Sequence, residues 1–285
     1  MPLPELLDEL FRLYRRHFSL IVVVALIVAL PGAVWQLVTG TYKLTASSYT
    51  NLFTTSPGAA PSFSSQQFSD LAGAFALGAL GALILLPFSV GAVYRAVTDV
   101  ALGRPATIGS VLRETLARYF PLLGLVALFV GIAIVWMIAL VIGFVLLVLP
   151  GLAVIGVGLY FGVRWSLSVA SMMAEDVGPI RGLGRSWALV KSQWWRTAGI
   201  LLIVFIMQAI IGYALGFLFG VIAALATTGD VRLAVVAVGS TLLGALINPI
   251  TTIAIVLLYF DLRVRKEGLD LDQLAQQTSP GPAPA

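Results

Sequence analysis

The sequence contains no cysteine and only one histidine, His17, in 285 residues. The lack of cysteine excludes disulfides, thiolate nucleophiles and zinc–thiolate sites, and a single histidine excludes a metal site built from several histidines. Charge is scarce as well: 11% of the residues are charged and 59% are apolar, against about 25% and about 45–50% in an ordinary soluble domain. This composition excludes a water-soluble globular protein.

Uncharged runs are long enough to cross a bilayer. Residues 120–163 contain no Asp, Glu, Lys, Arg or His, and a membrane-spanning helix needs about 20 apolar residues. Pro150 and Gly151 divide this run, because proline disfavours helix in the residue before it and glycine permits a tight reversal. The sequence therefore predicts an all-α integral membrane protein with six transmembrane helices, at about 18–38, 71–97, 121–149, 152–173, 197–225 and 234–260.

The charges that do occur lie mostly on one side of these spans. Fifteen of the seventeen Lys and Arg residues fall on that side, and only Lys43 and Arg232 fall on the other. By the positive-inside rule, we expect a multi-pass protein of the bacterial inner (plasma) membrane with both termini in the cytoplasm. Residues 1–268 are expected to form a single membrane domain, and 269–285 a disordered cytoplasmic tail. The polar stretch 39–70 is expected to be a solvated outer loop, with a small ordered lid as the alternative.

A unit of three parts occurs three times along the chain, at about 2–104, 105–177 and 178–266. Each unit begins with a short stretch of helical periodicity. In the first, Leu6, Leu10 and Tyr14 fall on one face, and Asp8 and Arg15 fall on the other. The fourth and sixth spans both end in the pattern L-Y-F-x-x-R, at 159–164 and 258–263. An aromatic residue followed by a cation is also common by chance where a helix leaves the membrane. We interpret this internal repeat as three transmembrane hairpins, each preceded by an amphipathic helix in the cytoplasmic interface.

The predicted spans contain few polar side chains. Gln208 and Asn248 are the main ones, and Pro249 has no N–H to donate to the carbonyl of Ala245 one turn earlier. Such side chains either repair the kink and bond a neighbouring helix, or contact a lipid or an ion. No acid lies within the spans to carry a proton, which argues against a proton-coupled transporter.

Glycines repeat at every fourth position in two of the spans. They are Gly158 and Gly162 in the fourth span and Gly212, Gly216 and Gly220 in the fifth. Small residues at this spacing let two helices approach closely within a membrane. We expect packing within one chain, with dimerisation as the alternative.

Charged residues at the ends of the spans are the candidates for a functional site. In one interpretation the arginines pair with carboxylates and lock the hairpins together, since partly dehydrated guanidinium groups favour carboxylates. In the other they bind phospholipid phosphates beside nearby tryptophans. The candidates for a lipid headgroup site or for structural salt bridges are Arg95, Arg164, Glu175, Arg181, Arg185, Asp261 and Arg263.

Four runs in the second half of the chain invite comparison with a known family. They are R-W-S-L-S-V-A-S-M-M-A-E at 164–175, G-P-I at 178–180, G-R-S-W-A-L-V-K at 184–191 and Y-F-D-L-R at 259–263. Together they resemble the membrane domain of some bacterial glycerophosphodiester phosphodiesterases and related stand-alone multispan proteins of unknown function. The first half is similar only in topology. In that family a separate soluble barrel is the hydrolase, and this sequence lacks its metal-binding acids and catalytic histidines. The resemblance therefore implies a membrane domain without hydrolase activity.

The sequence thus favours a non-enzymatic integral inner-membrane protein, a scaffold or lipid-interacting module with a basic cytoplasmic rim. Membrane phospholipids are the expected partners and a membrane-protein partner is left open, whereas nucleic acid, cofactors and metals are not expected. The alternative is a transporter or channel for a small or amphipathic solute through spans four to six, past Gln208 and Asn248. A membrane enzyme would need Glu175, Asp176 and Asp261 to converge on one cavity with a metal.

Overall fold

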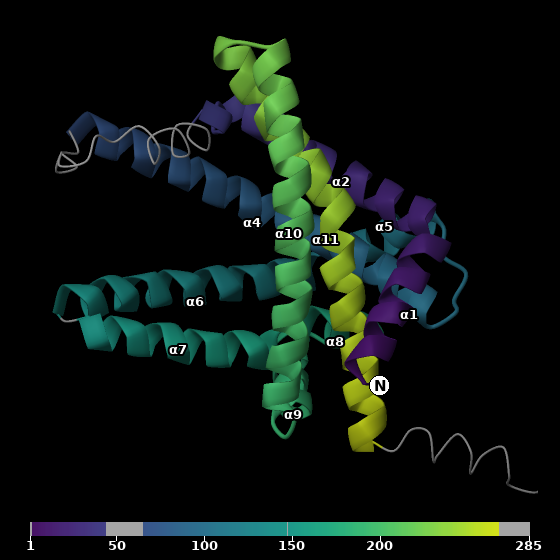
Figure 1. The fold of residues 1–285 in the computed structure, drawn as a ribbon. Coiled ribbons are helices and arrows are strands. Elements are labelled where there is room, and N and C mark those ends of the chain that lie inside the picture. The colour runs from purple at the N-terminus through teal and green to yellow at the C-terminus, as the bar shows by residue number, and fades with distance from the viewer. Residues whose placement is uncertain (1, 44–64, 147, 268–285) are drawn as a thin grey trace, which may run out of the picture.

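The computed structural model describes residues 2–43, 65–146 and 148–267, which are almost entirely α-helical (Figure 1). Within these ranges no β-strand is present. The predicted tail at 269–285 and most of the predicted outer loop at 39–70 lie outside the described residues. The helices are α1 (Leu3–Arg16), α2 (Phe18–Thr39), α4 (Ser65–Ala101), α5 (Ile108–Ala117), α6 (Tyr119–Leu146), α7 (Val148–Trp165), α8 (Ser168–Glu175), α9 (Pro179–Val190), α10 (Trp194–Ala226) and α11 (Gly229–Glu267).

Six stretches are long and apolar enough to cross a membrane, which confirms the prediction of an all-helical chain with six such segments. They expose large apolar side chains: Tyr213, Phe217 and Leu225 of α10 are each more than three-quarters exposed. A surface of this kind needs lipid rather than water beside it. The six stretches are Phe18–Thr39, Ala76–Ala101, Tyr119–Leu140, Pro150–Glu175, Trp194–Ala226 and Gly229–Glu267.

Local signals explain where several helices begin. At the start of α5, the amide of Ser110 donates to Thr107 Oγ1 at 3.2 Å, and the amide of Thr107 donates to Ser110 Oγ at 3.0 Å. This reciprocal pair satisfies two backbone donors at the helix start. Further along, α6 ends at Leu146 and α7 begins at Val148. Pro150 therefore lies in the first turn of α7, where its missing N–H leaves no helix bond unmade, and does not end the preceding span.

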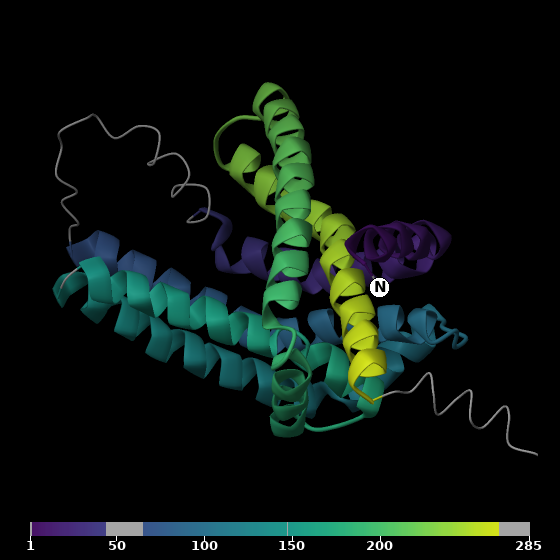
Figure 2. The same cartoon turned by 60° about the horizontal axis from the view of Figure 1, so that its bottom comes forward.

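The long helices pack in sequential pairs, α2 with α4, α6 with α7, and α10 with α11, and α2 also packs along α11. In Figure 1 the helices α10 and α11 run upward while α6 and α7 run sideways, and Figure 2 shows the same divergence from another direction. The pairs meet where the short helices α1, α5, α8 and α9 lie. We call this region the base of the molecule.

The core lies at the base and is built around the second half of α11. Ile253, Leu258 and Tyr259 of α11 are completely buried, and so are Leu6 and Leu10 of α1 in the same cluster. α1 packs directly on α11. The apolar face of the first amphipathic helix is therefore covered by protein, and its charged face remains exposed.

The repeated glycines behave differently from one another. A Cβ placed on Gly158 of α7 would lie 0.8 Å from the ring of Trp136 of α6, so these two helices approach closely at this point. A Cβ on any of the other four would meet no atom within 4 Å in the described part of the chain. The expected close packing is found at Gly158 and not at Gly162, Gly212, Gly216 or Gly220.

Candidate functional site

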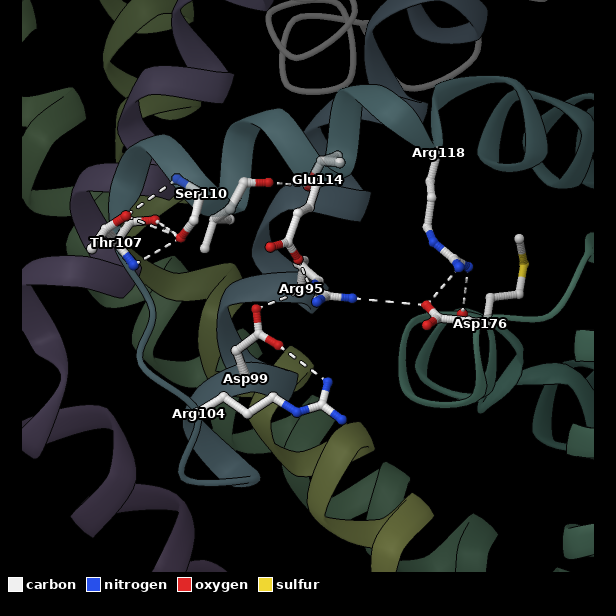
Figure 3. Close-up of polar contacts among 11 residues, drawn as sticks. Arg95, Asp99, Arg104, Thr107, Ser110, Glu114, Arg118 and Asp176 are labelled. Atoms are coloured by element: carbon white, nitrogen blue, oxygen red, sulfur yellow. Dashed lines mark hydrogen bonds and ion pairs between the residues drawn. The ribbon is translucent and has the colours of Figure 1, made fainter.

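Ion pairs at the base join helices that are far apart in the sequence. Arg95, near the end of α4, is 13% exposed and its Nε donates to Asp99 at 2.9 Å. Its guanidinium also contacts Glu114 of α5 and lies 3.8 Å from Asp176, which follows α8. Arg118, at the end of α5, lies 2.6 Å from the same Asp176 (Figure 3). We call this neutral group of three acids and three bases the Arg95 cluster: Arg95, Asp99, Arg104, Glu114, Arg118 and Asp176.

A second group, the Glu175 cluster, ties α8 and α9 to α11. Glu175 accepts two hydrogen bonds from Arg185 Nε, at 2.8 and 3.0 Å, and one from the hydroxyl of Tyr259 at 2.5 Å. Arg263 donates to Glu267 at 2.9 Å, and Arg185 also contacts Glu267. The cluster consists of Glu175, Arg185, Tyr259, Arg263 and Glu267, so its two acids balance its two bases.

Electrostatics within this cluster favour the charged form of Arg185. Partial burial alone would lower the pKa of Arg185, but hydrogen bonds and charge from Glu175 and Glu267 outweigh it and raise the pKa above its ordinary value. A group whose pKa is raised in the folded state stabilises that state at every pH below its unfolded pKa. Arg185 therefore acts as a permanently charged tie between α9 and its neighbours, with no titration near neutral pH.

A third contact links the start of α10 to the end of α11. Asp261 of α11 is buried, and its carboxylate lies 2.7 Å from Arg196 and 3.2 Å from Arg265. Since Arg196 is in the first turn of α10, this contact fixes the end of that helix against α11.

Arg164, near the end of α7, has a different environment. It is 6% exposed, and within the described residues it forms no ion pair with a carboxylate. Its guanidinium carbon lies 4.5 Å from the centroid of the Trp187 ring and 5.1 Å from that of Tyr160. One nitrogen donates to the Trp187 carbonyl at 3.2 Å and another to the Tyr160 hydroxyl at 2.6 Å. Its Nε is buried without a hydrogen-bond partner among those residues.

The seven rim candidates thus fall into three classes. Five of them form ion pairs: Arg95, Glu175, Arg185, Asp261 and Arg263. Arg164 is held by aromatic rings and carbonyl groups instead. Arg181 is exposed on α9, and in the described ranges it has no ion pair or hydrogen bond.

Several pairings of these residues were not predicted from the sequence. Asp99 follows Arg95 by four residues, a spacing that predicts a contact on one helix face. Arg118 and Asp176 are 58 positions apart, and no local pattern connects them. Only the packing of α8 beside α4 brings Asp176 to this place.

The polar residues of the spans bond to each other. Gln208 of α10 donates to Asn248 of α11 at 2.8 Å, and the hydroxyl of Thr251 donates to the Gln208 carbonyl oxygen. This agrees with the interpretation in which they bond a neighbouring helix. A cavity of about 410 Å³ between α10 and α11 is lined by both, and by Gly212 and Gly216.

The acids at the base lie apart from one another or face arginines. In the stretches that the structure describes, no three His, Cys, Asp or Glu side chains gather as a metal ion requires. Glu175 and Asp261 each face arginines, and Asp176 belongs to the Arg95 cluster, so these three acids do not form one site.

No protein-family model, curated protein or solved structure matches the chain. The motif resemblance to phosphodiesterase membrane domains therefore stands without an independent match. What the protein does has to be argued from its charges and its helix packing.

Proposed function

We propose that the protein is a non-enzymatic integral membrane protein of the bacterial inner membrane, acting as a scaffold and lipid-interacting module. The observation that carries the proposal is the pairing of charge at the base. Carboxylates from α5, α8 and α11 are each engaged by an arginine from a neighbouring helix, and long apolar helices extend from this charged base. Closed ion-pair clusters hold helices in place and leave no acid or base poised for catalysis.

The finer architecture belongs to the same proposal. We take the pairs α2 with α4, α6 with α7, and α10 with α11 as three transmembrane hairpins, with α1, α5 and α9 on the cytoplasmic surface before each. The direct packing within each pair supports this, as does the position of each short helix just before an outgoing span. The excess of Lys and Arg at the base favours a cytoplasmic location for it and for both termini.

Lipid analysis of the purified protein tests the lipid part. We expect anionic phospholipids to copurify at a higher proportion than in the host membrane, measured by mass spectrometry after extraction. The native lipid is then removed by exchange into mixed micelles of detergent and phosphatidylcholine. Addition of phosphatidylglycerol to these micelles should restore the enrichment of anionic lipid on the protein. Anionic lipid at or below its proportion in the host membrane would contradict the proposal.

Transport through α7, α10 and α11 is the second candidate, and the cavity beside Gln208 and Asn248 favours it. Because the chain has no cysteine, Ser240→Cys at the cavity wall would be the only target for a thiol reagent. A transport path predicts labelling by a membrane-impermeant maleimide in proteoliposomes, and loss of labelling when a transported solute is present. A path sealed by the Gln208 and Asn248 contact predicts no labelling from either side.

A further inference from the structure

A groove of about 680 Å³ lies between the end of α7 and the start of α10. Tyr160 and Arg164 line it from α7, Lys191 and Gln193 from the segment between α9 and α10, and Trp194 from the first turn of α10. Ser192, Trp195 and Arg196 complete this side of the groove. It lies at the base, next to the Asp261 contact that Arg196 makes.

We propose that this groove binds the phosphate of an anionic phospholipid headgroup. The inference deepens the proposed function, on which it rests, by naming the site and the chemical group recognised. We call it the α7 and α10 groove.

Arg164 supplies the first argument. It is more than nine-tenths buried, lines the groove and keeps an unpartnered Nε, and in the described residues no carboxylate neutralises it. A buried charge is costly unless an opposite charge and hydrogen bonds compensate it. Arg95, Arg185 and Arg196 each have a carboxylate beside them that balances their charge. Arg164 has no such carboxylate, and an anion bound in the groove would balance its charge.

Charge around the groove gives the second argument. Lys191 lines it together with Arg164, and no acid is among the residues that line it. Arg196 also lines it, but Asp261 balances the charge of Arg196. Lys266 of α11 lies close enough to be repelled by the charges of Arg164 and Lys191, and its ammonium is turned to the Ala188 carbonyl. This is a local excess of positive charge, in contrast to the neutral Arg95 and Glu175 clusters.

The start of α10 gives the third argument. Gln193 precedes this helix without a side-chain hydrogen bond to it, so the N–H groups of the first turn are not capped by that residue. The first N–H groups of a helix have no partner within the helix, and the helix dipole favours an anion there. Guanidinium and ammonium groups facing a helix N-terminus form a phosphate site of a familiar kind.

Aromatic residues indicate a lipid phosphate rather than a soluble one. The ring of Trp194 stacks on Tyr160, with centroids 5.8 Å apart, and Trp194 Nε1 donates to the Tyr160 carbonyl at 3.3 Å. Trp195 beside it is 84% exposed. Tryptophan and tyrosine concentrate at headgroup depth in membranes, so the groove opens where lipid phosphates lie.

Variants of the full chain test the site. The protein is reconstituted in nanodiscs of phosphatidylcholine with a small fraction of phosphatidylglycerol carrying a bromine-labelled acyl chain, and quenching of tryptophan fluorescence gives the affinity. Lys191→Gln is expected to weaken phosphatidylglycerol binding about tenfold, because the phosphate loses one charge-assisted hydrogen bond. Arg164→Gln is expected to weaken it at least as much. Because Arg164 is buried, its replacement can impair folding. The result for the exposed Lys191 therefore decides the test.

Arg181→Gln is the matched control, because Arg181 is an exposed cation on the same part of the chain but outside the groove. It is expected to leave the affinity unchanged. Equal losses in Arg181→Gln and Lys191→Gln would show nonspecific surface attraction and overturn the site. If Lys191→Gln and Arg164→Gln both bind phosphatidylglycerol with the wild-type affinity, the site is overturned while the proposed function stands. Absence of any preference for phosphatidylglycerol in the wild type would instead refute the proposed function itself.

Inorganic phosphate and glycerol phosphate are the competing probes. At millimolar concentration they are expected to leave phosphatidylglycerol binding within twofold, because they lack the acyl chains that the surrounding aromatic and apolar surface holds. Full displacement at that concentration would replace the lipid assignment with a soluble phosphate ligand.

Discussion

Ser186 of α9 is completely buried and bonds two backbone groups near the end of α7. Its hydroxyl donates to the Arg164 carbonyl at 2.7 Å and accepts from the amide of Leu167 at 3.1 Å. These bonds fix the turn that follows α7, and with it the position of Arg164. The hydroxyl of Ser186 therefore links α9 to Arg164 at the end of α7.

Replacement of Ser186 by alanine should destabilise the protein by about 1–3 kcal/mol, because a buried amide and a carbonyl lose their partner. Thermal unfolding in detergent, followed by circular dichroism, measures the change. Ser19→Ala on the exposed side of α2 serves as the control and should unfold at the wild-type temperature. An unchanged transition for Ser186→Ala would show that water replaces the hydroxyl.

Glu175 holds the neighbouring helices through its charge. Glu175→Gln should destabilise the protein by about 2–3 kcal/mol, because Arg185 and Arg263 lose their shared anion in a partly buried site. A double-mutant cycle of unfolding free energies with Arg185→Gln is expected to show coupling of about 1 kcal/mol or more.

The exposed pair of Lys43 and Asp230 provides the comparison. Its atoms lie 2.6 Å apart, but both side chains are more than half exposed, so water and salt screen their attraction. The same type of cycle should detect no coupling there. Equal coupling in the two pairs would contradict the importance assigned to burial.

At the scale of elements, α6 and α7 depend on one close approach. Gly158→Ala should force the Trp136 ring out of its place and destabilise the pair by about 1–3 kcal/mol. A shift in tryptophan emission together with a lower unfolding temperature would report it. Gly162→Ala, one turn later in open space, should be neutral or slightly stabilising because alanine favours helix. Identical behaviour of both variants would show that Trp136 moves freely.

The positions of the apolar segments were predictable from sequence, whereas the helix ends and the buried faces were less so. The predicted span 152–173 runs across the break between α7, which ends at Trp165, and α8, which begins at Ser168. Uncharged runs and charged breaks mark where apolar helices lie, since this depends on local composition alone. On α9, however, Ile180 belongs to the apolar face by periodicity and is 80% exposed, while the polar Ser186 is buried. The reason is that the end of α7 and α8 pack against α9, and their backbone groups need a hydrogen-bonding partner.

At the scale of the whole molecule, the divergence of the helix pairs conflicts with the geometry of a bilayer. Membrane helices stay within about 40° of the bilayer normal. In Figures 1 and 2 the pair α6 and α7 runs in a direction clearly different from α10 and α11. We therefore expect the far ends of the pairs to move toward one another when lipid surrounds them, with the base, where the α7 and α10 groove lies, as the pivot.

Spin-label distances test this closure, and the absence of cysteine makes labelling specific. Labels at Ile142→Cys on α6 and Val231→Cys on α11, both exposed, should lie closer together in nanodiscs than in detergent. Labels at Ile142→Cys and Leu152→Cys, within one pair, should keep the same distance in both. A distance between pairs that is the same in lipid and detergent would show that the divergence is rigid.

Sequence by itself determined that the chain is helical, has six apolar segments of membrane length and keeps most charge on one side of them, because composition and run length are local properties. Tertiary structure decided which charges are neutralised by residues of other helices. Arg164 and Arg263 end the same L-Y-F-x-x-R pattern, yet Arg263 pairs with Glu267 and lies near Glu175, while Arg164 lies between aromatic rings. The physical reason is that Arg263 and Glu267 are one turn apart on α11, so their contact follows from local spacing. Glu175 reaches Arg185 and Arg263 only because α8 and α9 pack against α11.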